Sequence, residues 1–190
     1  MARIPYPDDA ALSDETRRAL SSVPPLNVFR LLAHGDGALR NFLRLTGGLW
    51  NEAELSPRRR ELAILHVARL TGAEYEWHQH VAVARLVGLS DDELGALEAG
   101  DVDPGPFDED DRALLALVQV IVERGRADDE LFGAARGAFS DRELVELHLL
   151  VGIYAGLAAL MIDLDLDLDE QQGVDLLDSG PRGPRLGDGR

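Results

Sequence analysis

The sequence predicts an all-α protein, and three observations support this prediction. Apolar residues recur at helical spacing along most of the chain. Two segments open with a serine that is followed three residues later by a glutamate, which is the capping box of a helix start. No segment before residue 162 alternates convincingly between apolar and polar residues, as a half-buried strand would. The 190 residues therefore fit one helical domain with terminal arms.

The N-terminal part is expected to be an arm with short helices. Ser13 can cap a helix that ends before Pro24, because serine accepts from the first free amides and proline ends a helix. Residues 27–34 carry an apolar turn or two. Residues 38–49 have apolar side chains at helical spacing, which predicts an amphipathic helix.

The middle of the chain is expected to hold the central pair of helices. Ser56 supplies a cap, and Pro57 at the first helical position loses no needed hydrogen bond. Residues 61–70 are apolar nearly all round, which indicates a helix in the core. A second helix should follow the break at Gly72 and end at Gly88, where glycine can adopt the left-handed conformation.

The second half of the chain is expected to contain four further helices. Capping boxes at Ser90 and Ser140 open the first and the last of them. In the last helix Gly152 and Gly156 lie four residues apart, so another helix could approach closely in a core or subunit contact. These helices are expected at 90–100, 110–124, 128–139 and 140–161. The whole chain then divides into an arm at 1–37, a helical domain at 38–165, and an acidic edge with a disordered, flexible tail at 166–190.

Composition excludes several classes of function. With 35 acidic and 19 basic residues the formal net charge is −16, which should repel nucleic acid and anionic membrane surfaces. The chain has no cysteine, so it can form neither disulfides nor thiolate sites. The longest apolar run, 147–162, is short for a membrane span, which needs roughly 20 residues. The N-terminus lacks the apolar stretch of a secretory signal, so a cytoplasmic protein is expected.

Two glutamates and a histidine fall inside otherwise apolar helix faces. Glu61 shares a face with Ile64 and Leu65, and Glu76 lies one turn before His80. Because a buried charge is costly without a partner, such groups pair, change protonation state or do chemistry. Glu76 and His80 are expected to meet as an i, i+4 pair that fixes the histidine tautomer. The alternatives are a solvated Glu61 in a first helical turn and a purely structural Glu76–His80 pair.

Other residues near this stretch could bind a substrate. Tyr75 and Trp77 flank Glu76, and Tyr75 could donate its phenol to an oxyanion, although both could equally serve packing. Arg58 opens a basic cluster that could capture a substrate carboxylate or simply be solvated.

A metal site is not expected. Glu76 and His80 could share an ion, but no motif supplies a third ligand. Histidines without a supporting motif lie at positions 34, 66 and 148. The alternating aspartates of 163–169 lack the glycine turn and final glutamate of a calcium loop.

The pattern RRREL-x-IL-x-VARLTG-x-EYEW-x-x-H, followed by GLSDDEL, resembles the carboxymuconolactone decarboxylase family, which includes the alkylhydroperoxidase D-like proteins. The resemblance implies an alkylhydroperoxidase D-like helical bundle and a homo-oligomer, either dimer, trimer or hexamer. The redox branch carries Cys-x-x-Cys-x-x-x-His, whose positions fall on Ala73, Glu76 and His80, so the thiols are absent. The family's proton-relay glutamate falls on Glu61. Some relatives without cysteines carry Gly-x-Tyr-His in the last helix, where this chain has Ala155 in place of the histidine.

The resemblance implies a cofactor-free enzyme of acid–base type, a lyase close to carboxymuconolactone decarboxylase, acting on a small carboxylate or lactone. His80 would act as the acid, assisted by Glu76, with Glu61 as the relay base. Isomerase, hydratase and cyclase reactions could use the same residues. A non-catalytic oligomeric binding protein is the alternative from another class. A thiol peroxidase is not expected without cysteines.

Overall fold

The computed structural model describes residues 1–103 and 105–170 and confirms the all-α prediction, because no strand occurs in these residues. The expected tail from residue 171 onward lies outside them. The helices are α1 (Asp14–Leu20), α2 (Asn27–Leu32), α3 (Asp36–Asn51), α4 (Pro57–Thr71), α5 (Glu74–Leu86), α6 (Asp91–Ala99), α7 (Glu109–Val122), α8 (Asp129–Ala138) and α9 (Asp141–Asp163), with short 3-10 helices η1 (Asp9–Ala11) and η2 (Ala33–Gly35).

The helix ends form for the local reasons that the sequence contains. The Ser56 side chain accepts from the Arg59 amide at the start of α4, and Gly72 ends that helix with a left-handed φ of 74°. Both expected capping boxes, at Ser90 and Ser140, are present at α6 and α9. Gly88 also has a positive φ, of 105°. The caps fix where α4 ends and α5 begins. The two helices pack against each other with Glu61 and Glu76 buried, as their apolar faces predict.

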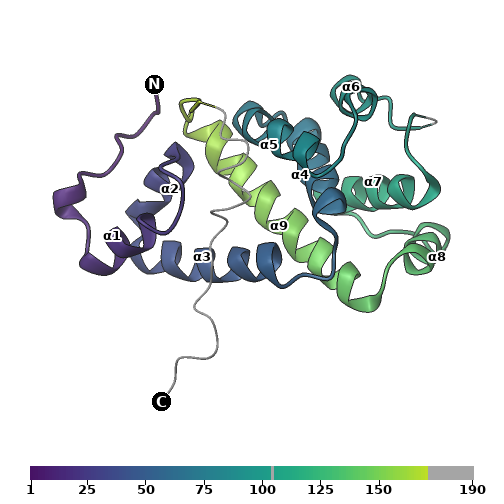
Figure 1. The fold of residues 1–190 in the computed structure, drawn as a ribbon, viewed down its shortest axis with the longest axis horizontal. Coiled ribbons are helices and arrows are strands. Elements are labelled where there is room, and N and C mark those ends of the chain that lie inside the picture. The colour runs from purple at the N-terminus through teal and green to yellow at the C-terminus, as the bar shows by residue number, and fades with distance from the viewer. Residues whose placement is uncertain (104, 171–190) are drawn as a thin grey trace, which may run out of the picture.

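The central helix of the bundle is α4, which packs against α5, α7 and α9 (Figure 1). Its side chains from Arg60 to Ala68 are all buried, as the apolar sequence predicts. Helix α9 runs across the molecule and contacts α4 and α7. By length and composition alone, α9 is the one helix in the described part of the chain that could cross a membrane, and such a property is shared by core helices of soluble proteins.

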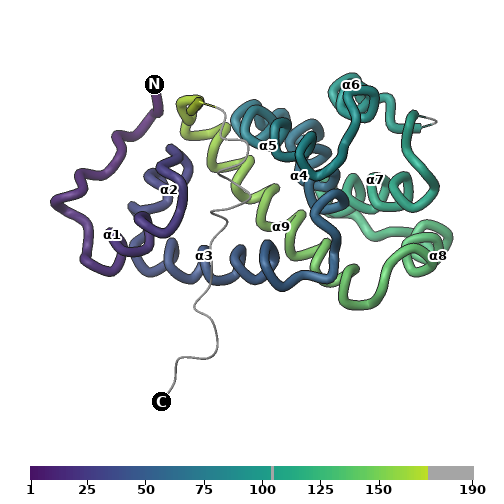
Figure 2. Tube along the Cα trace, in the orientation of Figure 1, coloured from purple at the N-terminus to yellow at the C-terminus, as the bar shows by residue number. Residues whose placement is uncertain are grey.

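A smaller group of helices at the N-terminal end completes the fold. Helix α1 packs against α3, and α2 lies between the N-terminal arm and the end of α9. Figure 2 shows the N-terminal segment running back toward the C-terminal end of α9. There the amino group of Met1 pairs with Asp167 at 2.9 Å, and the Arg3 amide donates to the Leu164 carbonyl at 2.8 Å. The two ends of the described chain are thereby held together.

The alternating aspartates at the end of α9 and after it do not form a strand; Asp163 and Asp165 are exposed, whereas Asp167 and Asp169 are partly buried. Asp167 accepts from the Ala2 amide, and Asp169 accepts from the Asn27 amide at 2.8 Å. Asp169 also accepts from the Tyr75 hydroxyl. We call residues 164–170 the C-terminal strap, because they tie the arm and α2 to α5.

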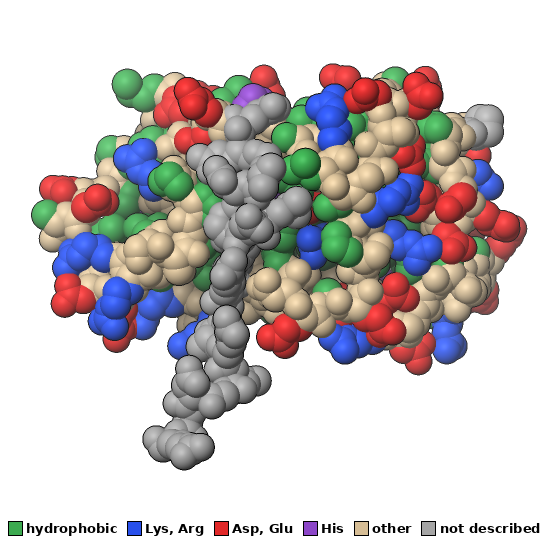
Figure 3. All heavy atoms as spheres, in the orientation of Figure 1, with side chains coloured by type: hydrophobic (Ala, Val, Ile, Leu, Met, Phe, Trp, Pro, Cys, Tyr) green, Lys and Arg blue, Asp and Glu red, His purple; other side chains and the backbone are tan. Residues whose placement is uncertain are grey.

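The exposed surface carries charges of both signs. Figure 3 shows acidic and basic side chains interspersed over one face, with hydrophobic side chains between them. On α9, Val145 and Leu149 are exposed by 60% and 46%, and Gly152 and Gly156 have open space where a side chain would stand. No helix in the described part of this chain therefore makes the close approach that the two glycines would allow.

Candidate active site

The central feature of the site is a hydrogen bond between two helices. Glu61, in the second turn of α4, has no exposed surface, and its Oε2 lies 2.7 Å from Nδ1 of His80 on α5. The His80 side chain is 12% exposed and lines a cavity. Because Nδ1 is engaged with Glu61, Nε2 is the ring nitrogen left for a bound molecule. The pair therefore has the geometry of a carboxylate that orients an imidazole.

The expected Glu76–His80 hydrogen bond is absent from the described structure, because Nδ1 of His80 is bonded to Glu61 instead. Glu76 is 2% exposed, and neither of its oxygens has a hydrogen-bond partner among the described residues. Burial raises the pKa of Glu76 well above its usual value of 4.5, and the charge of Glu61 raises it further. Both effects favour the neutral carboxylic acid, which offers an O–H donor.

The cavity beside these residues has a volume of about 90 Å³ and lies between α2, α3, α5 and α9. This volume suits a small molecule or several waters. Apolar side chains form most of its wall, and its polar members are Thr46, Trp50, Tyr75, Glu76, Gln79, His80 and Tyr154. The ring of His80 stands edge-on to that of Tyr154, with 5.3 Å between the centroids. Burial raises the pKa of Tyr154, which keeps its phenol protonated.

Arg60, next to Glu61 in the chain, contacts Trp50 and Glu61 without lining the cavity. It is 4% exposed, its guanidinium lies 4.0 Å from the Trp50 ring centroid, and its Nη1 donates to the Trp50 carbonyl at 3.2 Å. Its Nε is 3.6 Å from Oε1 of Glu61. Arg60 therefore supplies the positive charge that a buried Glu61 carboxylate requires.

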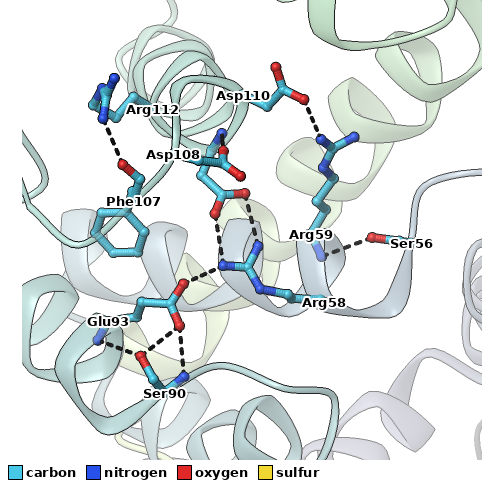
Figure 4. A network of polar contacts seen from close by, with 10 residues as sticks. Ser56, Arg58, Arg59, Ser90, Glu93, Phe107, Asp108, Asp110 and Arg112 are labelled. Carbon is cyan, nitrogen blue, oxygen red and sulfur yellow. Dashed lines mark hydrogen bonds and ion pairs between the residues drawn. The ribbon is translucent and has the colours of Figure 1, made fainter.

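The sequence suggested Arg58 as the residue of this basic cluster that binds a substrate carboxylate. In the structure Arg58 lies away from the cavity. Its guanidinium binds both oxygens of Asp111, at 2.9 and 2.8 Å, and contacts Glu93 (Figure 4). These ion pairs raise the pKa of Arg58 and fix α4 against α6 and α7. Arg58 does not line the cavity, so its assignment as a substrate-binding residue is not supported. The burial of Arg60 beside Glu61 could have been inferred from its place one turn before Ile64 on a buried face.

The two aromatic candidates differ in position. Tyr75 lines the cavity, but its hydroxyl donates to Asp169 and so is not free for an oxyanion; burial raises its pKa. Trp77 is partly buried against the main core, away from the cavity wall. Three cavity residues were not predicted from the sequence. Trp50 and Tyr154 lie on α3 and α9, which meet α5 only in the folded chain, whereas Gln79 could have been inferred from its place one turn after Glu76 on α5.

In the part of the chain that the structure describes, no three histidine or acidic side chains are grouped closely enough to hold a metal ion. His66, considered as a third ligand, is buried in α4, and burial lowers its pKa to about 4. A neutral imidazole there belongs to the core.

Comparison with known proteins supports the family resemblance and the fold. Residues 36–119 match the model of the carboxymuconolactone decarboxylase family, and this region contains Glu61, Glu76 and His80. The fold is similar to the alkylhydroperoxidase AhpD core of an uncharacterized peroxidase-related protein from Ralstonia eutropha, with a TM-score of 0.77 and 18% identity over 97% of this chain and 98% of that one. It is also similar to an uncharacterized peroxidase-related protein from Silicibacter sp., with a TM-score of 0.75 and 19% identity over 89% and 92% of the two chains. A search of curated proteins gives no match.

Proposed function

Starting from a chain whose residues 36–119 belong to the carboxymuconolactone decarboxylase family, we propose a cofactor-free enzyme that transfers protons on a small carboxylate or lactone. The observation that carries this proposal is the hydrogen bond of 2.7 Å between buried Glu61 and the cavity-lining His80. A carboxylate in this position stabilises the imidazolium that forms when the histidine accepts a proton. His80 is the proposed acid–base residue, and Glu61 is the residue that positions it.

The proposed chemistry is proton transfer at a carbon next to a carbonyl group. Nε2 of His80 would remove or return that proton, and the O–H of neutral Glu76 would donate to the enolate oxygen. Decarboxylation also leaves an enolate, which then needs a proton on carbon. The same residues therefore suit a lyase or an isomerase, and the apolar wall shields the enolate from water.

A thiol peroxidase does not fit the sequence, because the 190 residues contain no cysteine. The non-catalytic alternative predicts that Glu61 and His80 are solvent-exposed or paired away from any cavity, whereas the enzyme predicts that both line one pocket. His80 lines the cavity and buried Glu61 lies behind it, joined to it by the hydrogen bond, which favours the enzyme.

The remaining expectations are part of the proposal. A cytoplasmic homo-oligomer without nucleic-acid or membrane partners agrees with a net charge of −16 and with the exposed α9 face around Val145 and Leu149. Sedimentation velocity would give the subunit number.

The test is deuterium incorporation, followed by NMR, into a panel of small lactones and keto acids in heavy water, together with release of carbon dioxide. The proposal expects exchange into at least one compound and a loss of roughly 10²-fold or more in H80N and E61Q. H34N and E98Q are matched controls, because both side chains are exposed and outside the cavity. Wild-type rates in H80N and E61Q, or no exchange in any compound, would refute it.

A further inference from the structure

Two neighbouring side chains on the cavity wall have unused hydrogen-bonding atoms. Glu76 and Gln79 lie three residues apart on α5, so they share one face of the helix. They are 2% and 3% exposed. Within the described structure, both oxygens of Glu76 and Oε1 of Gln79 lack a hydrogen-bond partner. A buried polar atom without a partner is destabilising, so a folded protein that keeps three together on a cavity wall has a reason to do so.

The donor and acceptor pattern of this pair can be assigned. Both Glu76 oxygens are buried without a partner, and burial and the Glu61 charge raise the pKa of Glu76, which favours a protonated carboxyl that can donate. Nε2 of Gln79 donates to the Asp169 carbonyl at 3.4 Å, which leaves Oε1 as the acceptor. The pair thus offers one O–H donor beside at least one acceptor oxygen. A complementary ligand carries an acceptor oxygen next to an N–H or O–H donor.

The charges around the cavity disfavour an anion. Arg60 is stacked on Trp50 and faces Glu61, and no arginine of the described residues lines the cavity. Arg58 and Arg59 are paired with acidic residues of α7. A carboxylate brought into the cavity would lie near the Glu61 charge without a cation of its own. Burying an unpaired charge costs several kcal/mol, whereas an uncharged molecule avoids that cost.

The rest of the wall sets the shape of the ligand. Leu26, Val28, Phe29, Phe42, Leu157 and Met161 provide apolar contact around about 90 Å³ of space. An apolar ring would fill this part, with its polar group turned toward α5. Because area buried against apolar side chains contributes roughly 25 cal/mol per Å², the ring would supply most of the affinity and the polar pair the selectivity.

We propose that Glu76 and Gln79 form a recognition site for an uncharged small molecule with an apolar ring and adjacent acceptor and donor groups, such as a lactam or a hydroxylactone, and that carboxylate anions are rejected. This inference rests on the proposed function and narrows its substrate class from carboxylate or lactone to uncharged lactone-like compounds. It also narrows the reaction to proton transfer without loss of carbon dioxide, because decarboxylation requires a carboxylate.

The test compares two probes of nearly equal shape, benzamide and benzoate, by isothermal titration calorimetry. Benzamide has the acceptor and donor side by side, and benzoate has a negative charge and no donor. Wild-type protein is expected to bind benzamide at least about tenfold more tightly than benzoate, since one unpaired buried charge costs more than the ~1.4 kcal/mol that tenfold represents. E76Q keeps a neutral donor and should bind benzamide within a few-fold of wild type. E76L and Q79L should each weaken it by about fivefold or more.

Equal or tighter binding of benzoate, binding of neither probe, or benzamide binding that is unchanged in both leucine variants would overturn the inference. Circular dichroism confirms that each variant folds, and the wild-type comparison decides the charge preference even if a variant does not. Because calorimetry needs no turnover, this binding test does not depend on whether the protein catalyses the proposed proton transfer. Benzamide selectivity without deuterium exchange would refute only the enzyme, and exchange with a preference for benzoate would refute only this site.

Discussion

Replacing Glu76 with leucine should stabilise the protein, which is unusual for a buried position. Leucine has a similar size and no polar atoms, and both Glu76 oxygens lack partners among the described residues. Removing two such atoms relieves about 1–3 kcal/mol of desolvation cost. In a protein of this length each kcal/mol changes Tm by about 2–4 °C. We therefore expect E76L to raise Tm by several degrees while it weakens binding of polar ligands.

The stabilisation should also depend on pH with a defined sign. The pKa of Glu76 is raised in the folded protein, so above its usual value of 4.5 the unfolded chain has lost a proton that the folded chain keeps. Wild-type stability then falls as pH rises from there to the folded-state pKa, by up to ~1 kcal/mol per pH unit from this group. The charge facing Glu76 from α4 is Glu61, and the Tyr154 phenol on α9 stays neutral. E76L lacks this loss, so its advantage should grow with pH and then level off.

Urea denaturation followed by circular dichroism, at several pH values between about 5 and 8, measures this difference in free energy of unfolding. E98L is the matched control, because Glu98 is exposed and should show no such pH dependence. A destabilised E76L at every pH, or a difference that does not change with pH, would show that Glu76 is paired or ionised in the folded protein. The assignment of Glu76 as an unpartnered, protonated donor on the cavity wall would then be wrong.

Three further substitutions test the supports of the site. R58A leaves a buried carboxylate of α7 without its cation, so we expect a loss of about 3 kcal/mol in urea denaturation with ligand affinity unchanged. S140A removes the α9 cap and should cost about 1 kcal/mol, seen as a Tm lower by about 2–4 °C. Y75F removes the hydrogen bond to Asp169, and faster amide hydrogen exchange in the C-terminal strap is the expected readout; unchanged exchange would mean that the bond does not hold the strap.

The helices and their ends could be predicted because their causes are local. Ser56, Ser90 and Ser140 cap helices through contacts within three residues, and Gly72 ends one through its own conformational freedom. The all-apolar character of 61–70 correctly predicted the central helix. Such signals depend on neighbours along the chain, so the sequence contains them in full.

The pairing within the site could not be predicted in the same way. Spacing along α5 allowed a Glu76–His80 hydrogen bond. The packing of α4 against α5 instead brings Glu61 within hydrogen-bond distance of His80. That choice changes the chemistry, since it leaves Glu76 unpartnered and with a raised pKa instead of making it the orienting carboxylate. Likewise, adjacent arginines in one turn point to different sides, so Arg58 joins an ion-pair cluster and Arg60 supports the site.

The orientation of the His80 ring tests the central claim most directly. Nitrogen-15 NMR of histidine-labelled protein, with H80N to assign the resonance among five histidines, reports which ring nitrogen carries the proton above the ordinary histidine pKa of about 6.5. The account predicts that the neutral tautomer has its proton on Nδ1, held by Glu61, and leaves Nε2 to accept a proton from a bound molecule. A proton found on Nε2 would mean that Glu61 does not orient the ring, and the proposed acid–base site would be contradicted.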